Sequence, residues 1–159
     1  DGKASAPSLG LAGGGLAAMA VSRDGRRAAT VSNAGGDRSQ SLEAWDLTSG
    51  ERLWEVRRRD VRITTADVAP DGATLFVVTE PVGRGDAAAG GSSAVRLLEL
   101  AGGTELRFGP AGDEPLLTSA AVGGRVSGGA FASDGETIFL AGIRGVSEWD
   151  IAGRARVPG

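Results

Sequence analysis

The chain has 159 residues, the size of a single domain, and 41% of them are hydrophobic, enough to bury an ordinary core. It contains no histidine and no cysteine, which excludes Cys/His zinc sites, catalytic pairs built on either residue, haem ligation by histidine and disulfide bonds. The 17 basic and 20 acidic residues give a net charge of -3, so a nucleic-acid partner is not expected. The 27 glycines and the low aromatic content of 4% predict many short strands joined by turns.

Residues 1–15 are interpreted as an N-terminal linker or a closing strand. From residue 16 onward an Asp-Gly pair occurs three times, each time after a bulky apolar residue and before a β-prone segment. Such a pair between two apolar segments predicts a turn between antiparallel strands. The three pairs are Asp24-Gly25, Asp71-Gly72 and Asp134-Gly135.

A second pattern follows each Asp-Gly pair and predicts two more strands. Residues 42–47, 95–100 and 146–151 each read as a strand that ends in an acidic residue between apolar neighbours. A turn of small residues and a short outer strand come next, at 52–56, 105–108 and 155–157. The unit is therefore four strands, and we expect one unit at 16–57, one at 64–108, a long connection at 109–125 and a last unit at 126–159.

These landmarks resemble those of the WD40-like β-propeller repeat family in its degenerate bacterial form. The Asp-Gly segments look like the family's S-P-D-G turn, and Trp45-Asp46 and Trp149-Asp150 look like its name-giving dipeptide. The resemblance implies an all-β propeller of about three four-stranded antiparallel blades. A β-sandwich is the alternative. The family's Gly-His pair is absent, so its tetrad of His, Asp, Ser/Thr and Trp is not expected.

Three blades do not close a ring, since propellers contain about four to eight. An open set of blades is expected to leave two apolar sheet faces bare, which a monomer rarely shows. The expected partner is therefore another protein chain, or further blades that complete the ring. Trp45, Trp54 and Trp149 are interpreted as wedges between blades.

Strand direction alternates within a blade, so the connections fall on two opposite faces. The Asp-Gly turns share one face with the other tight turns. Residues 32–40, 57–62, 80–93 and 109–125 are expected to form longer loops on the opposite face. Long loops gathered on one face are typical of a working surface, although neutral variation of loops gives the same pattern.

The candidate binding residues lie in these loops. An arginine cluster beside two acids is either an internally paired rim or a contact for an acidic partner protein. A separate Arg-Gly-Asp string looks like the integrin-binding tripeptide, and it also arises by chance in such a chain. The partner-binding candidates are Arg57, Arg58, Arg59, Arg62, Arg84, Asp86, Asp113 and Glu114.

No catalytic constellation, metal site or cofactor is predicted, and the protein is not expected to be an enzyme. The Gly-rich segments 33–37 and 83–86 lack the alternating oxygen ligands of a calcium loop. Asp67 stands alone on an inner strand, as a structural hydrogen-bond acceptor or as a ligand in a central channel.

The function we expect is that of a protein-interaction scaffold or accessory subunit, which binds through the long-loop face and the open blade edges. The alternatives are a small-ligand or enzymatic propeller that uses the channel of a completed ring, and a secreted sensor or adhesion module. No apolar run reaches the about 20 residues of a membrane span, so a soluble chain is expected, and attachment to a membrane complex is compatible with this. The start at Asp1 favours export to an extracytoplasmic compartment or truncation, with a cytoplasmic location as the alternative.

Overall fold

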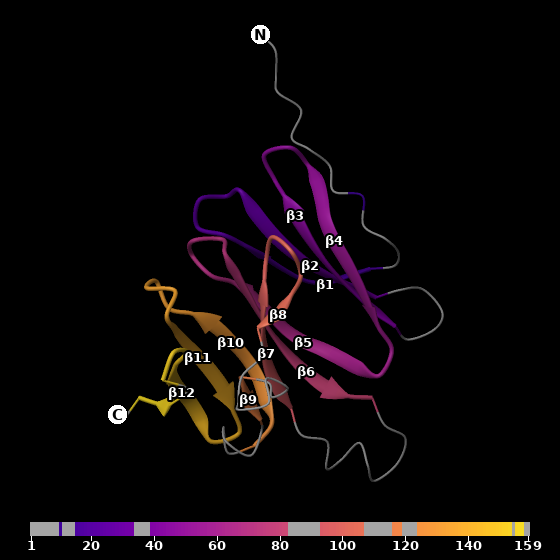
Figure 1. Cartoon of the computed structure of the whole chain (residues 1–159). Coiled ribbons are helices and arrows are strands. Elements are labelled where there is room, and N and C mark those ends of the chain that lie inside the picture. Colours follow the sequence, from indigo (N-terminus) through magenta and orange to yellow (C-terminus); the bar gives the residue numbers. More distant parts are fainter. Residues whose placement is uncertain are drawn as a thin grey trace.

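The computed structural model describes residues 10, 15–33, 39–82, 93–106, 116–118, 124–153 and 155–157. The regular elements in these ranges are β-strands, and they form three antiparallel sheets (Figure 1). In this part of the chain no helix is long and apolar enough to cross a membrane. The all-β class with three four-stranded units is therefore confirmed.

Each sheet uses a continuous part of the chain, with its four principal strands in sequence order. The first sheet contains β1 (Leu16–Val21), β2 (Arg27–Asn33), β3 (Gln40–Asp46) and β4 (Glu51–Arg58). The second contains β5 (Val61–Val68), β6 (Thr74–Pro81), β7 (Ala94–Glu99) and β8 (Glu105–Leu106). The third contains β10 (Val126–Phe131), β11 (Thr137–Gly142), β12 (Gly145–Asp150) and β13 (Ala155–Arg156).

Two connections differ from what the sequence predicted. The loop expected at 57–62 is a tight turn of only Arg59 and Asp60, because β4 and β5 both extend into it. Within 109–125, Leu117 and Thr118 form a short strand, β9, which pairs with the start of β7. The burial of Leu117 at 6% exposure explains why this segment packs onto the sheet.

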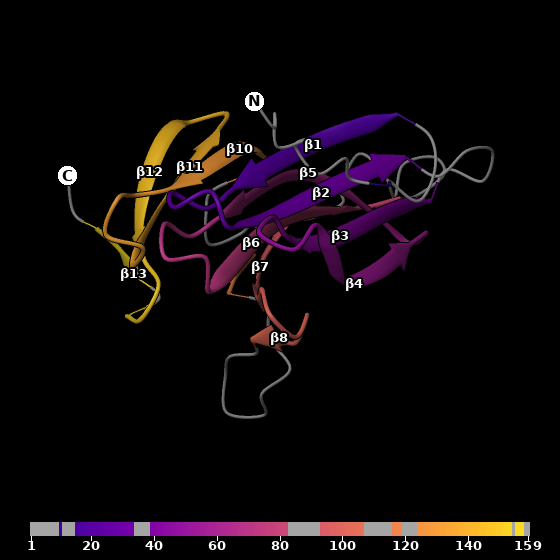
Figure 2. The ribbon, with the colours of Figure 1, turned by 90° about the horizontal axis from the view of Figure 1, so that it is seen from above.

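The three sheets stand next to one another around their first strands. Strand β5 contacts both β1 and β10, so the inner strands of the three sheets lie side by side (Figures 1 and 2). Figure 2 shows that the sheets fan out from this inner side toward their edge strands, β4, β8 and β13. We call the side of a sheet that is directed toward the next sheet in the chain its forward face, and the opposite side its rear face. In the third sheet, the forward face is the side directed away from the second sheet.

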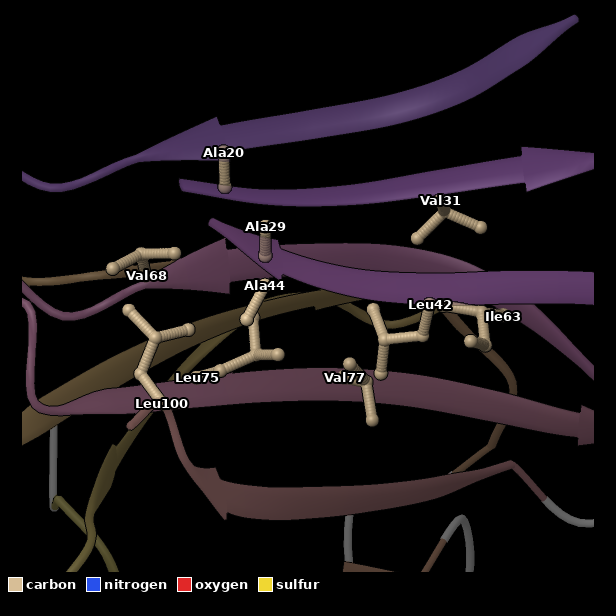
Figure 3. Close-up of a cluster of buried hydrophobic side chains, with 10 residues drawn as sticks. All are labelled: Ala20, Ala29, Val31, Leu42, Ala44, Ile63, Val68, Leu75, Val77 and Leu100. Atoms are coloured by element: carbon tan, nitrogen blue, oxygen red, sulfur yellow. The ribbon is translucent and has the colours of Figure 1, made fainter. Parts of the chain in front are cut away.

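The forward face of the first sheet packs on the rear face of the second. Figure 3 shows small side chains of β1, β2 and β3 directed toward larger aliphatic side chains of β5 and β6. Small residues on one side let the two backbones approach closely, and the larger ones fill the remaining space. This core contains Ala20, Ala29, Val31, Leu42, Ala44, Ile63, Val68, Leu75, Val77 and Leu100.

The forward face of the second sheet packs in the same way on the rear face of the third. Phe76 is fully buried there, and its ring lies 5.3 Å from that of Phe131 at an interplanar angle of 57°. Trp149 is 6% exposed and belongs to this core, so it is a wedge between two sheets. Trp54 reaches from β4 to the second sheet, where its Nε1 donates to the carbonyl of Leu100 at 2.7 Å.

Hydrogen bonds at the sheet junctions recur from one junction to the next. Gln40 Oε1, at the start of β3, accepts the backbone N–H of Ile63 at 2.6 Å, and Ser93 Oγ accepts that of Val126 at 3.4 Å. Asp67 accepts the N–H of Phe131 at 2.8 Å and that of Val68 at 3.0 Å, which gives it the structural acceptor role. These polar contacts fix how consecutive sheets dock, because a buried N–H needs an acceptor.

The Asp-Gly pairs lie in turns between the first and second strands. Gly25, Gly72 and Gly135 have φ values of 71°, 71° and 74°, a conformation that favours glycine. Each preceding aspartate accepts a backbone N–H two residues ahead, from Arg26, Ala73 and Glu136. This Asx-type bond explains the choice of aspartate at these turns.

Turn hydrogen bonds also lower the pKa of three aspartates. The Ser22 hydroxyl is the main cause for Asp24, and backbone N–H groups are the main cause for Asp46 and Asp134. In Asp46 the donors are the N–H groups of Thr48 and Ser49. These bonds stabilise the charged carboxylate, so in the folded protein the pKa of each aspartate lies below the ordinary value of 3.8.

The lowered pKa values predict a loss of stability in acid. Because the folded pKa lies below the unfolded one, the contribution is present above the ordinary pKa of 3.8 and is lost as the pH falls through the folded pKa. Thermal unfolding between about pH 6 and about pH 3 should show this decline. A variant with Asp24, Asp46 and Asp134 all changed to Asn should lose less of its melting temperature over the same range; equal losses would contradict the assignment.

Candidate functional site

The candidate arginines at the β4–β5 turn lie on the loop face, the side of the sheets opposite the Asp-Gly turns. Arg57 and Arg58 end β4, Arg59 is in the turn, and Arg62 is the second residue of β5. The other candidates, Arg84, Asp86, Asp113 and Glu114, lie outside the described residues. The structure therefore places four of the eight candidates, and their surroundings differ.

Arg57 belongs to an internal network on the first sheet. Its Nε donates to Glu55 Oε1 at 2.9 Å, and Glu55 also pairs with Arg52 at 3.0 Å and accepts the Ser41 hydroxyl at 3.1 Å. The bond from Arg57 is the main reason why the pKa of Glu55 is lowered. The contacts of Arg57 therefore agree with the interpretation of the arginine cluster as a charged rim that is paired within the chain.

Arg62 instead lines a cavity of about 530 Å³ at the loop face, which we call the mouth cavity. The inner strands of all three sheets contribute to its wall, through residues such as Ala17, Thr64 and Ser127. The side chains that can form polar contacts there are Asn33, Gln40, Arg62, Thr64, Glu80, Arg125 and Ser127. A concave site with several polar groups is the usual form of a binding site.

Glu80 and Arg125 form a bidentate ion pair on the wall of the mouth cavity. Arg125 donates from Nε to Glu80 Oε1 at 2.5 Å and from a terminal nitrogen to Oε2 at 2.9 Å. The bond to Glu80 raises the pKa of Arg125 above its ordinary value, so the guanidinium is permanently charged. The pair joins the second and third sheets and uses both oxygens of the carboxylate.

The side chain of Arg62 is exposed and forms no hydrogen bond or ion pair with the residues that the structure describes. It lies directly opposite Glu80 in the β5–β6 pairing, but Glu80 is engaged by Arg125. Within the first sheet, Asn33 Oδ1 accepts a hydrogen bond from Gln40 Nε2 at 3.2 Å. Among the described residues, the wall of the mouth cavity therefore contains two guanidinium groups and one carboxylate.

A buried polar network that sequence reasoning missed lies on the rear face of the first sheet. Trp45 Nε1 donates to Thr30 Oγ1 at 2.9 Å, and Thr30 donates to Glu43 Oε2 at 3.1 Å. The other oxygen of Glu43 accepts a bond from Arg52 at 3.2 Å. Glu43 is fully buried, and its carboxylate accepts a hydrogen bond from the hydroxyl of Thr30, which in turn accepts one from Trp45. This network contains no histidine and therefore differs from the family's tetrad.

The equivalent positions in the other sheets carry different polar pairs. In the second sheet the charges are reversed, because Arg96 replaces Glu43, Glu105 replaces Arg52, and the two are 2.5 Å apart. In the third sheet Trp149 Nε1 donates to Ser147 Oγ at 2.8 Å. Only a charged residue inside an apolar strand signalled this network in the sequence.

The rear face of the first sheet also corrects an expectation. It was predicted to be bare and apolar, but it contains Thr30, Glu43 and Trp45, which are 1%, 0% and 4% exposed. Trp45 is therefore buried without being a wedge between two of the described sheets. Of the three described sheets, only the third presents an exposed forward face.

Replacing Glu43 by leucine should lower the free energy of unfolding by about 1–3 kcal/mol, because the Thr30 hydroxyl loses its acceptor inside the sheet. Arg52 keeps Glu55 as a partner and is 39% exposed, so the loss of its own contact adds little. Urea denaturation followed by tryptophan fluorescence measures the change. A Glu105→Leu variant is the control: its carboxylate is partly solvated, so the loss should be smaller, and an equal loss would contradict a special role for Glu43.

Comparison with solved structures relates the three sheets to known propellers. The structure titled U3-55K matches with a TM-score of 0.61 at 16% identity, over 94% of this chain and 40% of the other. The chain folds as a WD40-like β-propeller segment. The RRP9 WD40 repeats match with a TM-score of 0.60 at 17% identity, over 94% of this chain and 39% of the other.

The hydrazine synthase of Kuenenia stuttgartiensis matches this propeller segment as well, with a TM-score of 0.57 at 19% identity, over 84% of the segment and 39% of that chain. The segment spans about two fifths of the length of each of these structures. No protein-family model and no curated protein sequence matches it. At these identities the likeness defines the fold, in which each sheet is one blade.

Proposed function

We propose that this chain is a degenerate WD40-like propeller segment that acts as a protein-interaction scaffold or accessory subunit of a larger complex. It binds through the loop face, where the mouth cavity lies, and through its open blade edges and the forward face of the third sheet. The observation that carries the proposal is the exposure of this forward face.

The positions of this face are buried wherever another sheet follows. Phe139 is 38% exposed, while Phe76, at the same place in the second sheet, is 0% exposed. Val146 is 67% exposed, while its equivalent Val95 is 1% exposed. The repeat therefore presents an apolar surface whose counterparts each pack against a sheet.

The occupant of this surface is a further propeller sheet. The two junctions in the structure show the required partner chemistry, an apolar rear face with residues such as Leu75 and Val77 or Ile138 and Leu140. The rear face of this chain's own first sheet has a different character, because Glu43 and Thr30 lie on it and are buried. We therefore expect the covering sheet to come from a partner chain or from further blades; in its absence, the exposed forward faces of two copies can pack on each other.

Light scattering coupled to size-exclusion chromatography tests this proposal on the chain alone. With its forward face uncovered, the chain should associate as its concentration rises, and Val146→Asp should suppress this. The control is Val82→Asp, because Val82 is exposed (48%) but lies after β6, away from this face. A folded chain that stays monomeric at all concentrations, or equal effects of both variants, would overturn the proposal.

A further inference from the structure

We infer that the mouth cavity binds a carboxylate side chain of an acidic protein segment and that Arg62 is the residue that receives it. The inference rests on the proposed interaction function and names the chemistry of the partner. It follows from a comparison of equivalent positions at the two sheet junctions.

Arg62 and Arg125 are equivalent residues. Each directly precedes the residue whose backbone N–H bonds to the previous sheet, Ile63 to Gln40 and Val126 to Ser93. Their equivalent counterparts across the junction are Asn33 and Glu80, the seventh residues of β2 and β6. Both junctions therefore bring an arginine to the end of the preceding sheet's second strand.

The two junctions differ in one charge. Glu80 neutralises Arg125 through a bidentate contact, whereas the residue at the equivalent position for Arg62 is the neutral Asn33, which lines the same cavity. Glu80 is also the cross-strand neighbour of Arg62, but both of its oxygens are bonded to Arg125. Among the described residues, one guanidinium thus lines the cavity without a carboxylate partner, at a position where the other junction supplies one.

The neighbouring groups suit a carboxylate. Gln40 uses its oxygen for Ile63 N–H and its nitrogen for Asn33 Oδ1, which leaves the NH2 group of Asn33 without a partner among the described residues. Arg62 offers a planar fork and Asn33 a further N–H donor on the same wall. Together they reproduce the type of donor set that Glu80 finds in Arg125.

The charges favour an acidic protein segment over a nucleic acid. Binding a phosphate backbone requires several cations along a surface, whereas the described part of this wall has one guanidinium without an ion-pair partner and the chain has a net charge of -3. A cavity of about 530 Å³ admits one or two side chains. An Arg–carboxylate contact inside such a cavity gives specificity in a protein interface.

The experiment measures binding of a fluorescein-labelled peptide of alternating glutamate and serine by fluorescence anisotropy. The same peptide with glutamine for glutamate is the neutral probe. We expect Arg62→Gln to weaken binding of the acidic peptide about tenfold, since a charge-assisted contact is removed. Asn33→Glu should weaken it to a similar degree while it keeps Arg62, because the new carboxylate occupies the place that Glu80 has beside Arg125.

Arg23→Gln is the matched control, because Arg23 carries the same charge but lies at the Asp24-Gly25 turn on the opposite face. It should leave binding unchanged. Equal binding of the glutamine peptide, unchanged binding after Arg62→Gln, or equal losses with Arg23→Gln would overturn the inference. Arg62-dependent binding of a single-stranded oligonucleotide or of inorganic phosphate at equal strength would also overturn the choice of an acidic protein segment.

The two proposals fail separately. The self-association assay reads the forward face of the third sheet, which does not include Arg62 or Asn33. If the peptide binds as expected while the chain stays monomeric, the sheet-face proposal fails and the mouth cavity assignment stands. If the chain associates and the peptide does not bind, the reverse holds.

Discussion

Replacing Phe76 by alanine will lower the free energy of unfolding by about 3–5 kcal/mol, whereas the same change at Phe139 will cost about 1 kcal/mol or less. The two residues are the third of β6 and the third of β11, so they hold the same place in the repeat. Phe76 is 0% exposed between two sheets, while Phe139 is 38% exposed on the forward face of the third. The difference is the contribution of the covering sheet, since the large cost arises from lost contacts and a residual cavity.

Urea denaturation of both variants, followed by tryptophan fluorescence at low protein concentration, measures this difference. The control is the slope of the unfolding free energy against urea concentration, which should be the same for both variants and the unchanged protein if all unfold from the same folded state. Equal losses for Phe76→Ala and Phe139→Ala would contradict the exposure of the third forward face. In the presence of a partner sheet we expect the cost of Phe139→Ala to rise toward that of Phe76→Ala.

A second large contrast lies on β10, where two adjacent glycines face different surroundings. A Cβ at Gly129 would lie 2.8 Å from the carbonyl oxygen of Phe139, 2.9 Å from Leu140 Cδ2 and 3.1 Å from Phe76 Cζ. A Cβ at Gly128 would meet nothing within 4 Å. Gly129→Ala will therefore lower the free energy of unfolding by about 1–3 kcal/mol through overpacking.

Gly128→Ala is the matched variant on the same strand and should change the free energy of unfolding by no more than about 0.5 kcal/mol. Both can be compared by thermal unfolding and by urea denaturation. Similar losses for the two would mean that the strand resists any side chain because of its backbone. A tolerated Gly129→Ala would mean that the second and third sheets are not docked as closely as the structure shows.

The turns show how much of this fold is local. Each Asp-Gly pair combines a glycine with positive φ and an aspartate that accepts a nearby N–H, and both requirements are met within a few residues. The same holds for Asp46, which accepts N–H groups two and three residues ahead. Because these contacts need no distant partner, the four-strand unit and its repetition could be predicted from the residues alone.

The binding site depends on contacts between units and was only partly foreseen. Arg62 was one of several arginines in a basic cluster, and nothing in the cluster separated it from Arg57. The structure separates them, since Arg57 bonds to Glu55 within its own sheet and Arg62 lines the mouth cavity together with Asn33 of the preceding sheet. Which acid neutralises which arginine is decided by side chains far apart in the sequence, and charge counts cannot reveal it.

The sequence by itself determined the all-β class, the three repeated units and their turns, because strand period and turn chemistry are encoded by neighbouring residues. Tertiary structure alone decided that β9 joins the second sheet, that Glu43 is buried with Thr30, and that the free apolar face belongs to the third sheet. It also decided that, of the two arginines that line the mouth cavity, Arg125 pairs with Glu80 and Arg62 has no carboxylate partner among the described residues. These features arise where separate units meet, and the docking of sheets is set by shape and by buried polar partners across the junction.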